Sequence, residues 1–121
     1  MASRARSQIY KKMHLNQSQG RPFSETHTHG TQALATKAAV AGKRHFITDI
    51  AVSSDKDGSV MQVKDGATVI WQVNLTNTVT GGPYIFWQSF VSPLIGTRGN
   101  AVSITIDGTS VCKANISGFT L

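Results

Sequence analysis

The sequence is poor in charged residues and in cysteine, and it has no long apolar run. Charged residues make up 15% of the 121 residues, whereas hydrophobic residues make up 40%. So few charges are unusual for a helical surface, and the hydrophobic fraction is too high for a disordered chain. The length suits one compact domain rather than two. We therefore expect a single folded domain with a packed core.

Cysteine occurs once, at Cys112, which excludes a disulfide within one chain. The fold must therefore depend on its core or on partner chains, as is usual for a protein assembled in a reducing cytoplasm. The apolar runs at 69–71 and 84–87 are far shorter than the ~20 residues that cross a bilayer. Residues 7–20 follow a basic start without an apolar block, so we expect neither a secretory signal nor a membrane anchor.

Positive charge is concentrated in the first part of the chain. Residues 1–45 contain eight of the twelve Lys and Arg residues but only one of the six acidic residues. Residues 1–30 also have few apolar residues, which predicts a basic arm that becomes ordered by docking onto a partner. The alternative is a frayed terminus. The partner-binding residues that we expect in the arm are Arg4, Arg6, Ile9, Tyr10, Lys11, Lys12, Met13 and Arg21.

The remainder of the chain has the alternating pattern and the β-branched residues that are typical of β-strands. About seven short strands without a convincing helix predict an all-β fold. We expect an antiparallel β-sandwich, jelly-roll-like in topology, over residues 31–121, with an extended basic N-terminal arm over residues 1–30. The expected strands lie at 33–41, 46–52, 60–64, 67–73, 84–90, 101–106 and 109–116.

Turn residues predict how these strands connect. Asp65-Gly66 and Asp107-Gly108 each separate two strand-like segments with the residues that suit a type I′ hairpin. Asp57-Gly58 is expected to turn the chain after the strand at 46–52. The basic run at 43–45 is expected to be a solvated edge. Alternation places Phe46, Thr48, Ile50 and Val52 on one face of their strand, and we expect Val69 and Ile104 in the core.

No set of residues predicts catalysis or a bound cofactor. Cys112 lies within a strand, where a buried thiol is the ordinary state, and most carboxylates adjoin turns, where aspartate serves the backbone. His27 and His29 would project to one side of an extended segment, but two imidazoles do not complete a metal shell. Three copies around a threefold axis would supply six, so a metal on such an axis stays open beside the simpler interpretation of a polar linker. We expect no catalytic residue, no cofactor and no metal within one chain.

Aromatic residues are concentrated in residues 71–90. Tyr84 and Phe86 share one face of their predicted strand, while Ile85 and Trp87 share the other, so both faces are apolar. This pattern predicts either a central strand of the sandwich or a subunit interface.

A series of short segments runs through most of the chain: KAAVAGKRHFIT at 37–48, VKDG at 63–66, VIW at 69–71, and later pieces within 90–102 and 111–119. Over about residues 33–121 they resemble small tailed-bacteriophage virion proteins with a β-sandwich domain, of the capsid decoration or cement type. Proteins of this type are often trimers, and similar domains occur in tails and fibres. The resemblance implies a homo-oligomer, with a trimer favoured, whose partner is the major capsid protein or another virion protein.

We therefore expect a structural protein of a virion, assembled in the host cytoplasm, that decorates the capsid surface through its arm and its oligomeric sandwich. One alternative is a tail, fibre or receptor-binding component that uses loops such as 74–83. Another is a nucleic-acid-binding protein that uses the basic arm. Only Tyr10 of the basic stretch could stack on bases, so we do not expect nucleic acid as the partner. A membrane partner is not expected either.

Overall fold

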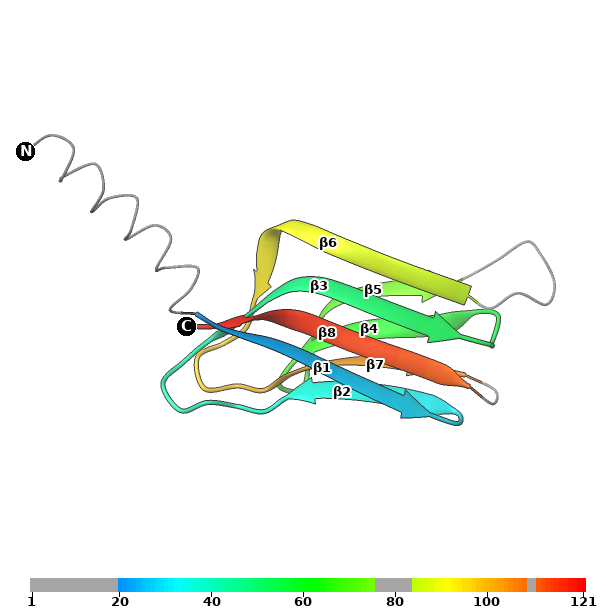
Figure 1. Cartoon of the computed structure of the whole chain (residues 1–121), viewed down its shortest axis with the longest axis horizontal. Helices are drawn as coiled ribbons and strands as arrows, with labels where there is room; N and C mark the ends of the chain where they lie inside the picture. The colour runs from blue at the N-terminus through cyan, green and yellow to red at the C-terminus, as the bar shows by residue number, and fades with distance from the viewer. Residues whose placement is uncertain (1–19, 76–83, 109–110) are drawn as a thin grey trace, which may run out of the picture.

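The computed structural model describes residues 20–75, 84–108 and 111–121, and these residues form eight β-strands. The strands make two four-stranded sheets that pack face to face (Figure 1). In the described part of the chain, no helix is long and apolar enough to cross a membrane. The strands are β1 (Arg21–His29), β2 (Gln32–Lys37), β3 (His45–Ser54), β4 (Ser59–Asp65), β5 (Thr68–Leu75), β6 (Tyr84–Ile95), β7 (Val102–Asp107) and β8 (Cys112–Thr120).

The strand order shows how the chain winds around its core. It is β1-β8-β3-β6 in one sheet and β2-β7-β4-β5 in the other. Four antiparallel pairs are nested: β4 with β5, β3 with β6, β2 with β7, and β1 with β8. The chain is therefore one long ribbon that folds back on itself between β4 and β5 and then wraps into a sandwich. This arrangement is a jelly roll, which confirms the predicted fold.

Strand β1 lies in the segment that the charge pattern assigned to the arm. Its residues pair with β8 along its whole length, from Arg21 opposite Thr120 to His29 opposite Cys112. Phe23 is 8% exposed and belongs to the core. Residues 21–29 are therefore part of the sandwich rather than of an arm, because backbone pairing with β8 orders a segment that has few apolar residues. Residues 1–19 lie outside the described residues.

One of the two predicted hairpins forms. Strands β4 and β5 are joined by the two residues Gly66-Ala67, one position later than expected. Only Gly66 has a positive φ, 59°, whereas a type I′ turn needs positive φ at both positions. The hairpin predicted at Asp107-Gly108 is wrong, because β7 lies between β2 and β4 while β8 lies between β1 and β3. Asp107-Gly108 instead leads from one sheet to the other.

A β-bulge at Thr48 changes the faces expected for the first half of β3. The register of β3 shifts there against both of its neighbours, β6 and β8. Ile47 is therefore buried together with Ile50. Phe46 lies on the outer face and stacks on Phe119, with 4.8 Å between the ring centroids. The predicted grouping of Phe46 and Thr48 with Ile50 is wrong because a period of two cannot be counted across an inserted residue.

The core lies between the two sheets. In the central strand β7, Val102, Ile104 and Ile106 are fully buried and alternate with partly exposed residues. Val69, which was expected in the core, is 40% exposed because the register of β5 shifts at Ile70 and places Val69 opposite Lys64 rather than on the inner face. His45, which was expected to be solvated, is fully buried. Register shifts, as well as alternation, therefore decide which side chains are covered.

We expect Gly118→Ala to destabilise the protein by about 2 kcal/mol, measured by urea unfolding. Gly118 lies on β8 beside the bulge, and a Cβ there would overlap the carbonyl oxygen of Phe46. Ser103→Ala, on the outer face of β7, is the control and should change the free energy of unfolding by less than about 0.5 kcal/mol. Equal effects of the two substitutions would show that the bulge tolerates a side chain.

We expect Ile104→Asp to prevent folding, because an unpaired carboxylate in the core costs several kcal/mol. Val69→Asp should leave a folded protein, since its side chain reaches water. Circular dichroism and cooperative thermal unfolding of the two variants test this pair. A folded Ile104→Asp variant would contradict the assigned core.

Candidate functional site

The residues that the sequence assigned to binding are described only in part. Arg21 begins β1 and is exposed. His27 is exposed on β1, and its Nδ1 accepts a 3.0 Å hydrogen bond from the N–H of Leu34 on β2. The side chain of His29 is outside the described residues, and no cluster of three or more potential metal ligands occurs among those described. A metal on a threefold axis thus stays a prediction. Also outside the described residues are Arg4, Arg6, Ile9, Tyr10, Lys11, Lys12 and Met13.

Two titratable groups, Asp65 and Cys112, have shifted pKa values, and the interactions that cause the shifts lie within the fold. Asp65 accepts hydrogen bonds from the backbone N–H and the hydroxyl of Thr97, at 3.0 and 2.6 Å. Burial raises the pKa of Asp65, but the hydrogen bonds from Thr97 and Asn100 outweigh this effect, so its pKa lies below the ordinary value. Cys112 is fully buried, and burial together with nearby carboxylates raises the pKa of its thiol. An inaccessible, protonated thiol is a poor nucleophile.

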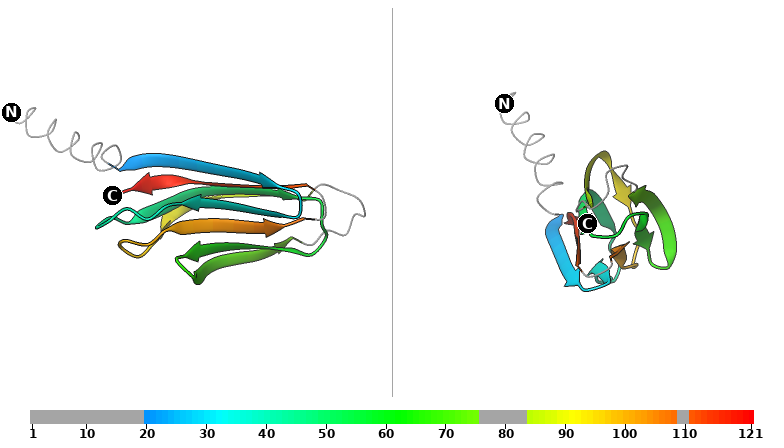
Figure 2. Two further views of the ribbon diagram at one scale, coloured as in Figure 1. Left: turned by 90° about the horizontal axis from the view of Figure 1, so that it is seen from below. Right: turned by 90° about the vertical axis from the view of Figure 1, so that its right-hand side faces the viewer.

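One lateral edge of the sandwich carries no charged residue. Strands β5 and β6 are the last strands of their sheets, and each pairs with one neighbour only. The 8 residues of β5 and the 12 residues of β6 include no Asp, Glu, Lys or Arg. We call these two strands the uncharged edge. The end-on view in Figure 2 shows them, in green and yellow, on the side opposite β1 and β2, in blue and cyan.

Three aromatic rings join β5 to β6 across the gap between the sheets. The ring centroid of Trp71 on β5 lies 5.9 Å from that of Phe86 and 5.6 Å from that of Phe90, both on β6. The second pair meets edge to face at 84°, an attractive geometry for aromatic rings. All three rings pack against the core and are partly buried. They therefore hold two strands of different sheets in a fixed relation.

Outside these rings, β6 exposes large apolar side chains. Ile85 is 65% exposed and Trp87 is 72% exposed, in alternation with the inward-facing Tyr84 and Phe86. Trp87 lies opposite Ala51 of β3, whose small side chain leaves the indole uncovered. Both faces of this strand are apolar, as predicted, but β6 is not a central strand. The interpretation of this segment as an interface stays open.

The apolar surface continues past a bend in β6. In the pairing of β6 with β3, residues 90–93 have only Thr48 opposite them. Figure 1 shows that β6 turns sharply at this point. Val91 at the bend is fully exposed, and Ile95 is 54% exposed. Several exposed large apolar side chains on one strand favour an interaction surface more than a single exposed residue does. The unpaired backbone groups of an edge strand also offer hydrogen bonds to another strand.

The opposite edge, formed by β1 and β2, is protected against such contacts. Pro22 on β1 has no N–H to offer. The imidazole of His27 occupies the N–H of Leu34 on β2. Arg21 and Lys37 add charge to this edge, and burying such charge against another chain is costly. Strand addition is therefore disfavoured by charge at β1 and β2 and unhindered by charge at β5 and β6, although Pro93 removes one N–H from β6.

Comparison with known proteins gives distant matches only. No family model matches the chain, and no curated protein matches its sequence. Among solved structures, it is similar to the insecticidal delta-endotoxin Cry8Ea1 of Bacillus thuringiensis, with 11% identity, a TM-score of 0.39, and coverage of 81% of this chain and 19% of the toxin. It is also similar to PliG of Aeromonas hydrophila, a periplasmic inhibitor of g-type lysozyme, with 12% identity, a TM-score of 0.37, and coverage of 84% and 89%. Likenesses this distant carry no functional argument.

Proposed function

We propose that the protein is a structural component of a bacteriophage virion, which assembles into a homo-oligomer and decorates the capsid surface. The observation that carries the proposal is the uncharged edge, with Trp87, Ile85 and Val91 exposed on it. Burial of such side chains against another protein stabilises an assembly by removing apolar surface from water. The uncharged edge therefore supports a role in assembly.

A second copy of the chain is the occupant that suits this edge. In a symmetric contact, the same surface patch is used on both subunits. The chain has a net charge of +6, so a contact made through charged parts of its surface would bring like charges together. Across the uncharged edge two copies meet without this repulsion. Burial of the Trp87 indole would contribute most to the stability of such a contact, since tryptophan side chains dominate the binding energy of many interfaces.

Attachment to the capsid would use a different part of the chain. Residues 1–19 contain Arg4, Arg6, Lys11 and Lys12 and no acidic residue. They precede β1, which lies on the edge of the sandwich opposite β6 (Figure 2). Copies joined through the uncharged edge would thus present several basic segments to an acidic capsid surface. Linked attachment points raise the effective concentration of each, so weak individual contacts suffice.

The assignment to a virion is supported by the sequence resemblance over about residues 33–121, because a jelly roll by itself serves many functions. The second candidate, a tail or fibre component, differs in copy number. Quantification of the chain in purified particles separates the two: copies on the order of hundreds support the capsid surface, while a few dozen or fewer support the tail. Absence of the chain from particles would contradict both.

We expect the full-length protein to be oligomeric and Trp87→Lys to raise its dissociation constant by about 30-fold or more, as for an interface residue worth about 2 kcal/mol. Leu34→Lys is the matched control, because Leu34 is 45% exposed on the opposite edge. Sedimentation velocity over a range of concentrations gives the oligomeric state of each variant. A monomeric wild-type protein, or dissociation by Leu34→Lys alone, would contradict assembly through the uncharged edge.

We expect deletion of residues 1–19 to abolish particle binding and to leave the melting temperature unchanged, because the deletion stops before β1 and keeps its pairing with β8. The measurement is co-sedimentation with particles that lack the protein, at low and high salt. Binding by the full chain should weaken as salt increases, since exposed charges are screened. Equal binding by the full and truncated chains would show that the sandwich makes the contact.

A further inference from the structure

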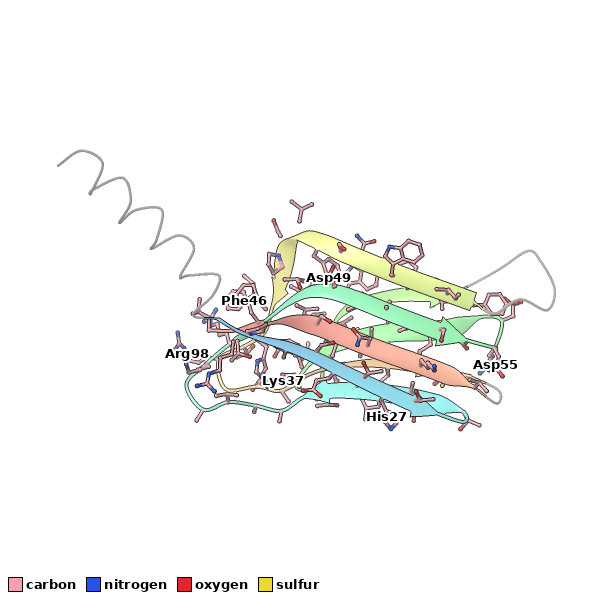
Figure 3. All side chains as sticks on the ribbon, viewed as in Figure 1. His27, Lys37, Phe46, Asp49, Asp55 and Arg98 are labelled. Carbon is pink, nitrogen blue, oxygen red and sulfur yellow. The ribbon has the colours of Figure 1, made fainter. Side chains whose placement is uncertain are left out.

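A pocket of about 230 Å³ lies where β1 begins and β8 ends, away from the uncharged edge. Its described lining consists of Arg21 on β1, Lys37 at the end of β2, Val40 and Lys43 in the loop between β2 and β3, and Thr120 at the end of β8. Figure 3 labels Lys37 at this end of the sandwich. Three segments of the chain, around residue 21, at residues 37–43 and around residue 120, therefore meet around one small space.

The described lining of the pocket carries positive charge and no Asp or Glu side chain. Arg21, Lys37 and Lys43 supply three cations, and none of the described acidic residues lines the pocket. Three like charges around one space repel one another, so their convergence destabilises the empty pocket and favours a bound anion. Both ammonium groups and the guanidinium make strong, charge-assisted hydrogen bonds to oxyanions.

The loop that carries Lys43 is fixed by hydrogen bonds from its surroundings. The guanidinium of Arg98, labelled in Figure 3, donates a 2.7 Å bond to the carbonyl of Gly42. The N–H of Gly99 donates to the carbonyl of Lys43 itself. The backbones of Arg44 and Leu121 exchange two hydrogen bonds, of 3.0 and 2.9 Å, which tie the loop to the end of β8. Lys43 and Thr120 are thus held beside each other before any ligand binds.

Buried His45 links two of the segments that line the pocket, through hydrogen bonds to Ala38 and Thr120. Its Nε2 donates a 2.8 Å bond to the carbonyl of Ala38, which can only accept. In the neutral imidazole, Nδ1 then accepts from the hydroxyl of Thr120, at 2.6 Å. The ring of Phe23 meets His45 edge on, and the ammonium nitrogen of Lys37 lies 5.7 Å from the centroid of that same ring. The cation of Lys37 is therefore positioned by an aromatic face rather than by an acidic partner.

We infer that this pocket binds one small oxyanion of charge −2, of the phosphate or phosphate monoester class. The volume is below the roughly 300 Å³ at which sites for whole small molecules begin, so the pocket suits a single charged group. Three cations match a dianion better than a singly charged group. Because the cations surround one pocket instead of following a groove, the arrangement differs from a surface that tracks the phosphodiesters of nucleic acid.

Calorimetric titration of the full-length protein with inorganic phosphate tests the inference, in chloride buffers of matched ionic strength. We expect saturable binding that is about tenfold weaker in Lys43→Gln, the loss of one charge-assisted hydrogen bond. Lys113→Gln is the matched control, because Lys113 is exposed at the start of β8, the end far from Thr120. Thermal unfolding in chloride should be the same for both variants, which shows that both are folded.

Dimethyl phosphate, a singly charged phosphodiester, provides the second arm of the experiment. It should bind at least about tenfold more weakly than inorganic phosphate, because it lacks one charge and one of the terminal oxygens that accept strongly. Equal or tighter binding of dimethyl phosphate would overturn the inference in favour of a phosphodiester. Absence of phosphate binding by the wild-type chain, or equal affinities of Lys43→Gln and Lys113→Gln, would overturn it altogether.

Discussion

The insertion of β8 between β1 and β3 is the constraint on which the rest of the structure depends. Strand β8 pairs with both neighbours along its length, so the last strand of the chain occupies the middle of its sheet. This placement leaves β6 at the end of the sheet, where one side has no partner strand. It also brings Thr120 beside the start of β1 and beside His45, and so assembles the basic pocket. The uncharged edge and the basic pocket therefore both result from the insertion of β8 between β1 and β3.

Local signals in the sequence predicted the kind of structure but not the partners of each strand. Alternation identified β7 and its buried Ile104, and the turn at Gly66 marked a real hairpin. The Asp-Gly pair at 107–108 has the same local chemistry, yet it connects two sheets, because pairing in a jelly roll is set by distant segments. Strand β1 was missed for a related reason: it contributes Phe23 to the core, but its order depends on backbone hydrogen bonds to β8, which composition does not reveal.

The two proposed binding surfaces were predictable to different degrees. The apolar character of both faces of β6 was visible in Tyr84 to Trp87, but only the strand order shows that one face is uncovered. The excess of positive charge in residues 1–45 was also visible. The convergence of this charge on one pocket could not be seen in the sequence. Arg21, Lys37 and Lys43 enclose the pocket only once β8 brings Thr120 beside them and Arg98 holds the loop between β2 and β3. The sequence contains no short motif that would have indicated this arrangement.

The difference between the two edges also limits the kind of assembly that the sandwich can form. A sheet that is open on both sides can add copies without end, which leads to fibres. Here β1 and β2 are protected by the bond from Leu34 to His27 and by charge, while β5 and β6 lie together on the edge that carries no charge. In a symmetric contact the uncharged edge of one copy meets the same edge of a second copy, so the contact uses up this edge in both copies. One uncharged edge per chain therefore favours a finite pair over a polymer.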